Sequence, residues 1–459
     1  MNILVKQFFI EKIAHSSYLI GGKKTCAIVD PARDVERYIE SAKKEGLKIT
    51  HILETHLHAD FVSGHIDLAG ITGADIYAPS AGKCEFDHIP VSDNSVFSLE
   101  DIEFHVSETP GHTPESVIYS VIDKSRGDEP VAVFTGDTLF VGDVGRPDLF
   151  PGMAEELADK LFSSIHLKVE KLPDECLVFP AHGAGSLCGK SMGAMKISTI
   201  GYEKKYNGAL LIKEKDEFIA SLTTDMPPAP DHFGRCSQIN REGPGKISNL
   251  PSPLELTPDE FYKKMNDGNT IVVSIRDYAT FGGQHIPGSY HIDINGNFST
   301  FAGWVLPPDK DILLVSDNPV QVDEAVLLLR RVGLDRTYGY LSGGTHAWVS
   351  QGYKTEHVHQ LSPYEVYEKI KDRNVLLLDV RGKDEYDAFH VKGSLNIMAM
   401  DLRTRYTEID PKRPVIAMCR TGHRSSLACS ILKQKGFREV YNAAGGITGY
   451  IAAGFLKTG

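Results

Sequence analysis

Two histidines and an aspartate occur within five residues, as His56, His58 and Asp60. This H-x-H-x-D cluster directly follows a strand-like run at residues 49–53. Imidazole and carboxylate groups are the usual ligands of zinc, iron and manganese. The next residue is Phe61, where a two-metal site would need another ligand. The cluster therefore predicts a site for one metal ion, and a single metal favours oxygen chemistry over hydrolysis.

Three further candidate ligands occur in the first half of the chain, each behind a strand-like run. Loops that leave strands at one edge of a sheet can converge, and enzymes commonly place their sites there. Four such segments in one chain are specific for a metal centre. The three ligands are His112, after residues 102–106, Asp137, after residues 131–136, and His182, after residues 176–181.

A second kind of chemistry is indicated near the end of the chain by Cys419. This cysteine follows a strand-like run at residues 414–418, and a helical pattern begins at Ser425. The backbone N–H groups of such a loop and the positive end of the helix dipole favour a thiolate, and Arg420 and Arg424 add positive charge. We therefore expect Cys419 to be a nucleophile that carries sulfane sulfur as a persulfide.

The elements that position Cys419 belong to the second copy of a repeated unit. In each copy apolar runs alternate with helical patterns, which predicts a compact α/β domain with parallel strands and crossover helices. The first copy has Asp317 where the second has Cys419, and a carboxylate cannot carry a persulfide. The matched positions are residues 256–260 and 361–365, Arg276 and Arg381, His285 and His390, and Gly288 and Gly393, all 105 residues apart, with Gly343 and Gly445 102 residues apart.

The length of 459 residues predicts about two to four domains. Stretches rich in proline and glycine at residues 226–230, 243–245 and 251–253 indicate a linker region. We expect domains at residues 1–245, 254–355 and 356–459.

The composition limits the partners and the compartment. A net charge of −12, without a basic run of about five to eight residues, argues against nucleic acid. No apolar run is long enough to span a membrane, and the first twenty residues indicate a strand pair and not a signal peptide. Seven scattered cysteines do not form a disulfide framework. We expect a cytoplasmic protein that forms a homo-oligomer.

The first half of the chain resembles the metallo-β-lactamase fold in its T-H-x-H-x-D, P-G-H and G-D-T segments. The resemblance implies an αββα sandwich in which these segments are the metal loops. Two-metal hydrolases of this fold, such as glyoxalase II, have a second-metal histidine where this chain has Phe61. His65 is the nearest substitute, and we expect it to be a structural histidine.

Without a second metal, His56, His112 and Asp137 form a set of two histidines and one carboxylate, which suits non-haem Fe(II). The pattern resembles the persulfide dioxygenases, the mononuclear iron branch of the fold. The resemblance implies one Fe(II) per chain and a persulfide of glutathione, coenzyme A or a similar thiol, which is oxidised by O₂ to sulfite. Zinc is the alternative metal.

Five other residues of this domain have roles that the sequence leaves open. His58, Asp60 and His182 are either further ligands or groups that orient the ligands by hydrogen bonding. The resemblance implies that Arg146 contacts the thiol carrier. Cys188 either handles sulfur near the iron or packs in the core.

The last domain resembles the rhodanese sulfurtransferases. The resemblance is carried by residues 419–425, residues 378–381, Glu385, His390 and the glycine pair 445–446. The six-residue loop from Cys419 matches rhodaneses, whereas related phosphatases use seven residues, so loop length favours sulfur over phosphate. The first copy then corresponds to an inactive rhodanese-like domain that serves as a spacer or a docking module.

The combination resembles fusions of a persulfide dioxygenase with a rhodanese. It implies sulfide detoxification, in which Cys419 exchanges sulfur among persulfide, sulfite and thiosulfate. One alternative is a zinc-dependent thioester hydrolase of the glyoxalase II type with an appended sulfurtransferase, which Phe61 disfavours. Another is a sulfur-relay protein in which only Cys419 acts, which the complete set of metal ligands disfavours.

Overall fold

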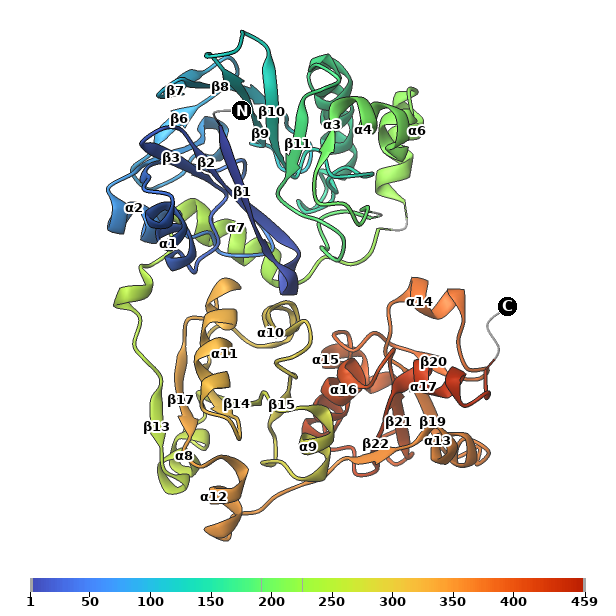
Figure 1. The fold of residues 1–459 in the computed structure, drawn as a ribbon. Helices are drawn as coiled ribbons and strands as arrows, with labels where there is room; N and C mark the ends of the chain where they lie inside the picture. Colours follow the sequence, from blue (N-terminus) through green and yellow to red (C-terminus); the bar gives the residue numbers. More distant parts are fainter. Residues whose placement is uncertain (1–2, 191, 225, 457–459) are drawn as a thin grey trace. The chain divides into compact units, whose positions relative to one another are not determined.

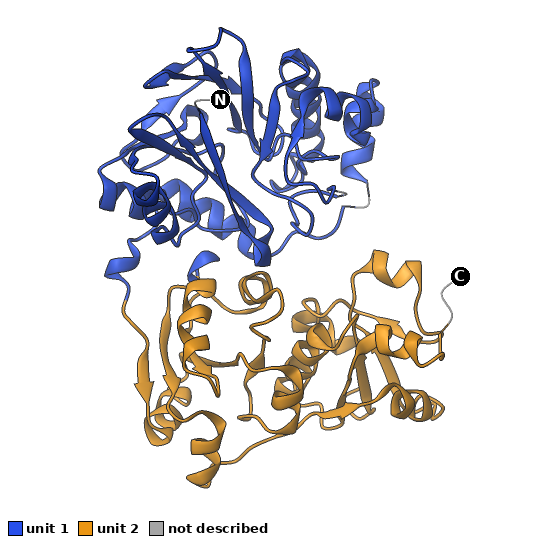
Figure 2. Ribbon diagram, in the orientation of Figure 1, with its two compact units in different colours: residues 1–250, 330–333 blue, residues 251–329, 334–459 orange. Residues whose placement is uncertain are grey.

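The computed structural model describes residues 3–190, 192–224 and 226–456. It divides into two compact units (Figure 2). Unit 1 comprises residues 1–250 and 330–333, and unit 2 comprises residues 251–329 and 334–459. Within the described part of the chain, no helix combines the length and the apolar character needed to cross a bilayer.

Unit 1 is an αββα sandwich of two six-stranded sheets, as the metal-loop motifs predict (Figure 1). The first sheet has the order β1-β2-β3-β4-β5-β6 and the second β12-β11-β10-β9-β8-β7. The strands are β1 (Leu4–Ile10), β2 (His15–Gly21), β3 (Thr25–Val29), β4 (Lys48–Leu53), β5 (Asp75–Pro79), β6 (Ile89–Val91), β7 (Val96–Leu99), β8 (Ile102–Glu108), β9 (Val117–Asp123), β10 (Pro130–Gly136), β11 (Leu177–Pro180) and β12 (Ser198–Thr199).

Helices cover the outer faces of both sheets, with α1, α2 and α7 outside the first and α3, α4 and α6 outside the second (Figure 1). Short 3-10 turns are η1 (Glu11–Ile13), η2 (Ser80–Gly82), η3 (Val169–Lys171) and η4 (Ile247–Asn249). The helices are α1 (Glu36–Lys44), α2 (His65–Thr72), α3 (Ala154–Leu167), α4 (Ile200–Tyr206), α5 (Gly208–Leu211), α6 (Lys215–Thr223) and α7 (His232–Glu242).

Alternation along the strands produces these layers, because successive strand residues face opposite sides of a sheet. In β2, Tyr18 lies in the core between the sheets, whereas Leu19 lies in the core that includes side chains of α1 and α2. In β10, Phe134 lies between the sheets and Val133 packs in the same core as Leu161 of α3. The two sheets thus form a rigid support for the loops at their edge.

The linker region that the sequence indicates contains a helix. Helix α7 lies between the proline-rich and glycine-rich stretches. It forms because Phe233, Cys236 and Asn240 lie on one face of the helix and are buried. The flanking Pro and Gly residues thus bound a helix of the metal-binding domain.

Unit 2 contains two α/β domains, each with a five-stranded parallel sheet. The orders β13-β17-β16-β14-β15 and β18-β22-β21-β19-β20 are the same topology. The strands are β13 (Leu254–Leu256), β14 (Thr270–Ser274), β15 (Tyr290–His291), β16 (Asp311–Val315), β17 (Thr337–Leu341), β18 (His359–Leu361), β19 (Leu376–Asp379), β20 (Leu395–Asn396), β21 (Val415–Met418) and β22 (Val440–Ala443).

The helices of unit 2 repeat with the same period as the strands. Capping boxes begin α8 at Thr257 and Glu260 and α13 at Ser362 and Glu365. The helices are α8 (Pro258–Met265), α9 (Tyr278–Gly283), α10 (Phe298–Val305), α11 (Val320–Arg331), α12 (Gly344–Ser350), α13 (Pro363–Lys369), α14 (Lys383–Ala388), α15 (Leu402–Arg405), α16 (His423–Gln434) and α17 (Gly446–Ala452), with the 3-10 turn η5 (Tyr406–Glu408).

Candidate functional site

Three side chains from three separate loops of unit 1 converge on one point. Asp137 Oδ2 lies 3.7 Å from His56 Nε2 and 3.3 Å from His112 Nε2. All three residues are buried, and among the described residues none of these three atoms has a hydrogen-bond partner. Because unpaired buried polar atoms are costly, their convergence fits the binding of a metal ion.

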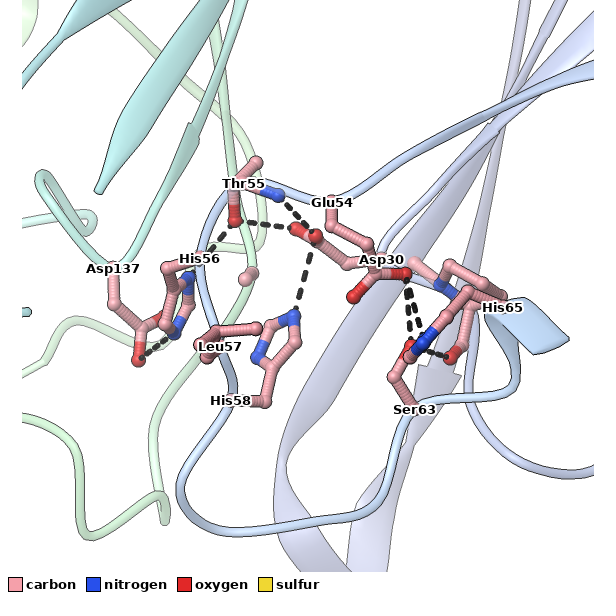
Figure 3. A network of polar contacts seen from close by, with 12 residues as sticks. Asp30, Glu54, Thr55, His56, Leu57, His58, Ser63, His65 and Asp137 are labelled. Atoms are coloured by element: carbon pink, nitrogen blue, oxygen red, sulfur yellow. Dashed lines mark hydrogen bonds and ion pairs between the residues drawn. The ribbon is translucent and has the colours of Figure 1, made fainter. Parts of the chain in front are cut away.

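Hydrogen bonds at the other ring nitrogens determine which nitrogen of each histidine faces this point. His56 Nδ1 lies 2.9 Å from Thr55 Oγ1, whose hydroxyl donates to Asp30 Oδ2 at 2.8 Å (Figure 3). His112 Nδ1 lies 2.9 Å from the carbonyl oxygen of Arg146. Each Nδ1 therefore carries the proton and donates it, and each Nε2 lone pair is left for a metal.

The protonation states also suit a metal site, since ligands must be neutral imidazoles and ionised carboxylates. Burial lowers the pKa of His56 well below its usual value and lowers the pKa of His112. Burial acts to raise the pKa of Asp137, but the neighbouring His182 and His112 hold it well below its usual range. The carboxylate is therefore ionised at neutral pH.

Gly136 brings Asp137 close to the H-x-H-x-D loop. Its φ is +51°, and a Cβ at this position would lie 2.5 Å from Thr55 Oγ1. A residue with a side chain would therefore be strained and would displace the hydroxyl that orients His56.

His58 and His182 contact carboxylates beside the cluster. His58 is turned toward Asp30, with Nε2 3.2 Å from Oδ1 (Figure 3). His182 lies between two carboxylates, with Nδ1 2.7 Å from Asp137 Oδ1 and Nε2 2.9 Å from Asp60 Oδ2. Burial acts to lower the pKa of His182, but these carboxylates raise it well above its usual value. Of the two roles left open by the sequence, the contacts favour orientation of the ligands.

Phe61, the residue after Asp60, is buried against the rings of neighbouring side chains. The Phe61 ring is fully buried, with its centroid 4.2 Å from that of His15 and 4.4 Å from that of His58. His65 begins α2 and packs on Phe86 at 4.5 Å between ring centroids. Burial lowers the pKa of His65 to about 3, as expected for a neutral structural histidine.

Cys188 is buried near the cluster, and its thiol lies within 4.8 Å of ligand-type atoms of Asp60 and His182. Burial raises the pKa of Cys188 well above its usual value, so that the thiol stays protonated. Both nitrogens of His182 already face carboxylates. Asp60, His182 and Cys188 thus form a second group of ligand-type atoms, but its sulfur is a protonated thiol.

Arg146 is almost fully buried, with a relative exposure of 1%. Its guanidinium donates to Asp148 at 2.6 and 2.7 Å and to the carbonyl oxygens of Leu187 and Pro227. These contacts differ from the expected contact with a thiol carrier, because the donors are used inside the protein. The backbone of Arg146 instead positions His112.

Sequence reasoning missed two residues that hold the H-x-H-x-D loop in place. Asn240 of α7 is fully buried and donates to the carbonyl oxygens of His58 and Phe61, each at 2.8 Å, while accepting from Ser63 N–H at 2.8 Å. No motif marks Asn240. Asp30 could have been found, because it directly follows a strand-like run.

A cavity of about 460 Å³ is lined by residues of the loops that carry His56 and His112. Leu57, between the two loop histidines, and Thr113, directly after His112, line it. Lys83 and Arg241 also line the cavity and are exposed to solvent. The cavity therefore combines an apolar wall beside the cluster with cations at its exposed side.

In unit 2, Cys419 lies in the loop between β21 and α16. Its Sγ is buried and accepts hydrogen bonds from Gly422 N–H at 3.1 Å and from Ser425 Oγ at 3.3 Å. Donors that converge on sulfur stabilise a thiolate, as the sequence predicts for this loop.

The two arginines of this loop differ in their surroundings. Arg424 makes a two-pronged ion pair with Glu385, at 2.5 and 2.9 Å. Arg420 is exposed to solvent. Arg424 therefore fixes the loop to α14, and Arg420 is the more accessible cation.

The equivalent loop of the first α/β domain is occupied by its own carboxylate. Asp317 Oδ1 accepts from Thr345 N–H at 3.0 Å, and Oδ2 lies 3.2 Å from Nη1 of Arg276. The carboxylate thus binds donors from α12 and from the segment after β14, and it offers no nucleophilic sulfur.

Comparisons with known proteins match a different family to the metal-site half of the chain and to the two α/β domains. The metallo-beta-lactamase superfamily model matches residues 11–182, and the rhodanese-like domain model matches residues 257–351 and 362–453. A persulfide dioxygenase of Mus musculus is 30% identical over 236 residues, which covers 50% of this chain and 85% of that protein.

Two further relatives match the first domain, and the second of them also extends beyond it. A hydroxyacylglutathione hydrolase of Rhodospirillum rubrum is 34% identical over 169 residues, 36% of this chain and 60% of that protein. The crystal structure of a metallo-beta-lactamase from Staphylococcus aureus matches with a TM-score of 0.66 at 34% identity, and covers 74% of this chain and 99% of that one.

Proposed function

Because the chain belongs to the metallo-β-lactamase superfamily, as a homologue of persulfide dioxygenases that carries two rhodanese-like domains, we propose that it oxidises the terminal sulfur of a small thiol persulfide. One O₂ and one water supply the three oxygens of sulfite, and the thiol is released. The observation that carries this proposal is the convergence of three unpaired buried atoms, from His56, His112 and Asp137.

The metal that we propose is Fe(II), held by these two imidazoles and one carboxylate. Iron held by these residues would supply the oxygen chemistry at the substrate sulfur. Thr55 and the Arg146 carbonyl hold the two imidazoles in the required tautomer. Phe61 offers no ligand where a second metal of this fold would need a histidine, which favours oxygenation over two-metal hydrolysis.

The adjoining cavity suggests the class of thiol carrier. Its apolar wall at Leu57 excludes water beside the cluster, and the Lys83 and Arg241 cations face solvent. Cations placed in this way attract carboxylates and phosphates. Glutathione and coenzyme A both carry such groups, so we propose an anionic thiol of this kind.

Cys419 is proposed to transfer sulfur between thiosulfate, sulfite and thiol persulfides, in support of sulfide detoxification. Its thiolate attacks the outer sulfur of thiosulfate, the S–S bond to sulfite breaks, and the electron pair leaves with sulfite. An acceptor thiolate then removes the sulfur from Cys419. Gly422 N–H and the Ser425 hydroxyl stabilise the thiolate before and after transfer.

The test is metal content and O₂ uptake on glutathione persulfide, measured for wild type and His112→Ala. We expect about one iron per chain and loss of uptake in the variant. His105→Ala is the matched control, because His105 lies on β8 with an exposed side chain that pairs with Glu103. About two zinc ions per chain, thioester hydrolysis and no uptake would replace this proposal with a hydrolase.

A third outcome concerns sulfur transfer alone. Iron-loaded protein that transfers sulfur through Cys419 but consumes no O₂ with any persulfide would indicate a relay protein. The proposal predicts instead that both activities occur in the same preparation.

A further inference from the structure

Residues of the first rhodanese-like domain cover one side of the loop that carries Cys419. His423 Nδ1 lies 3.0 Å from Oδ2 of Asp293, which follows β15. The ring of Tyr278, at the start of α9, packs edge-on against the His423 ring with 5.1 Å between centroids. All of these residues belong to unit 2, so the contacts lie within one compact body.

Tyr278 also lies beside the backbone that positions the thiol. Gly422 has φ +111°, and a Cβ there would lie 3.1 Å from Cζ of Tyr278. The N–H of Gly422 is the group that donates to Cys419 Sγ. The tyrosine ring therefore limits the movement of a residue that holds the nucleophile.

Asp293 is fixed so that one carboxylate oxygen remains for His423. Its side chain is 2% exposed. Oδ1 accepts hydrogen bonds from the backbone N–H of Asn295 at 2.9 Å and from its side-chain amide at 3.1 Å. A buried carboxylate is stable only when paired, and the ion-pair contact with Nδ1 of His423 supplies a partner for Oδ2.

We propose that Asp293 and Tyr278 are positioning residues of the sulfurtransferase site, which hold His423 as a hydrogen-bond donor for the oxyanion end of thiosulfate or sulfite. The inference rests on the proposed sulfur transfer at Cys419. Asp293 engages Nδ1, so Nε2 is the nitrogen left for a ligand. The domain without a thiol thereby completes the site of the domain that has one.

The charge of His423 depends on this contact. The titratable groups that face it are Asp293, Asp277, Tyr278 and His291. The contact with Asp293 is the largest cause that raises the pKa of His423, against the effect of burial. A raised pKa keeps Nε2 protonated to higher pH, and loss of Asp293 moves the loss of this proton to lower pH.

The test uses the full-length protein and measures thiocyanate formation from thiosulfate and cyanide between pH 5 and 9. We expect Asp293→Asn to raise the KM for thiosulfate roughly five- to tenfold, the size of one lost charged hydrogen bond, with a smaller change in kcat. The decline of kcat/KM with rising pH should begin at lower pH. His423→Gln should show the same increase, and the double variant no further one.

Two matched variants separate positioning from packing. Tyr278→Phe keeps the ring and should behave as wild type, whereas Tyr278→Ala should raise KM. Ser430→Ala removes a hydrogen bond to the backbone N–H of His291 at the same junction, away from the loop, and should leave KM unchanged.

The outcomes distinguish this inference from the proposed function. If wild type forms no thiocyanate, or Cys419→Ser forms as much as wild type, the proposed sulfur transfer fails. If wild type is active and Asp293→Asn has the same KM and pH profile with only a lower melting temperature, the contact is structural and the inference is overturned. An NMR titration in which the pKa of His423 is unchanged by Asp293→Asn would also overturn it.

Discussion

At the metal centre, the hydroxyl of Thr55 lies between Asp30 and Nδ1 of His56, the ring nitrogen that faces away from the cluster. We expect Thr55→Val, which removes the hydroxyl at nearly constant volume, to weaken iron binding roughly tenfold, because groups that orient a ligand typically contribute this much. The measurement is iron retention against a chelator series, with O₂ uptake at saturating iron.

The chain contains a matched control for this substitution. Thr50 Oγ1 lies 2.9 Å from Nδ1 of His51, which is the same arrangement five residues earlier in the sequence, on β4. His51 lies outside the cluster of His56, His112 and Asp137. Thr50→Val should leave iron binding unchanged. Equal loss in both variants would mean that strand packing, and not orientation of His56, is responsible.

A second residue-scale prediction concerns acid stability. Burial lowers the pKa of His285 to about 4, whereas an unfolded histidine titrates near 6.5. The unfolded state therefore binds a proton first, and stability is lost as the pH falls from 6.5 toward 4. Replacement by Gln removes this titration.

The expected effect can be observed in one domain, because both tryptophans of the chain, Trp304 and Trp348, lie in the first rhodanese-like domain. Between pH 7 and pH 5, wild type should lose about 2 kcal/mol more of unfolding free energy than His285→Gln, measured by urea denaturation with tryptophan fluorescence. Parallel pH dependence in the two proteins would contradict the neutral burial of His285.

Residue types and spacing predicted that His56, His112 and Asp137 would come together, because each follows a strand of a sheet. They could not predict Asn240 or Asp293. Both act through contacts with loops far away in sequence, and such contacts depend on how helices and domains pack. The buried guanidinium of Arg146 illustrates the same limit, since its partners lie at Leu187 and Pro227.

At the scale of elements, the strand-like runs predicted strands closely, and those at residues 102–106 and 131–136 lie within β8 and β10. Helix α7 was missed because proline and glycine on both sides indicate a linker, and its role depends on three hydrogen bonds from one buried asparagine. Local propensity does not encode a buried polar contact of this kind.

We expect Asn240→Ala on α7 to release the H-x-H-x-D loop. It would leave the carbonyl oxygens of His58 and Phe61 and the N–H of Ser63 without this partner, at a cost of roughly 3 kcal/mol in the stability of unit 1. Iron content and O₂ uptake should fall together. Glu242→Ala, an exposed position on the same helix, is the control, and equal loss there would indicate general destabilisation of α7.

At the scale of the whole molecule, the duplication has given two domains of the same topology, of which only the second has the cysteine. The repeat of 105 residues predicted the shared topology, and Asp317 predicted the loss of the thiol in the first copy. The structure adds that Arg276 and the Thr345 N–H bind this carboxylate. At the position of Cys419 the first copy thus has a carboxylate whose partners lie on other elements, on α12 and after β14.

The proposed pair of activities makes a prediction for the intact chain. Thiosulfate and glutathione together should support O₂ uptake, because Cys419 would transfer sulfur to glutathione and the metal site would oxidise the resulting persulfide. Cys419→Ser should abolish this uptake but leave uptake on added glutathione persulfide unchanged, whereas His112→Ala should abolish both. Uptake from thiosulfate that survives in Cys419→Ser would show that the rhodanese site does not feed the metal site.

Mixing the two variants then shows how sulfur moves between the sites. If glutathione persulfide diffuses through solution, Cys419→Ser and His112→Ala together should restore uptake from thiosulfate, because one protein makes the persulfide and the other oxidises it. A reagent that traps glutathione persulfide in solution should suppress O₂ uptake in the mixture. If the trap suppresses uptake equally in wild type, the carrier leaves the protein in both cases. Uptake that resists the trap only in wild type would require direct transfer within one chain.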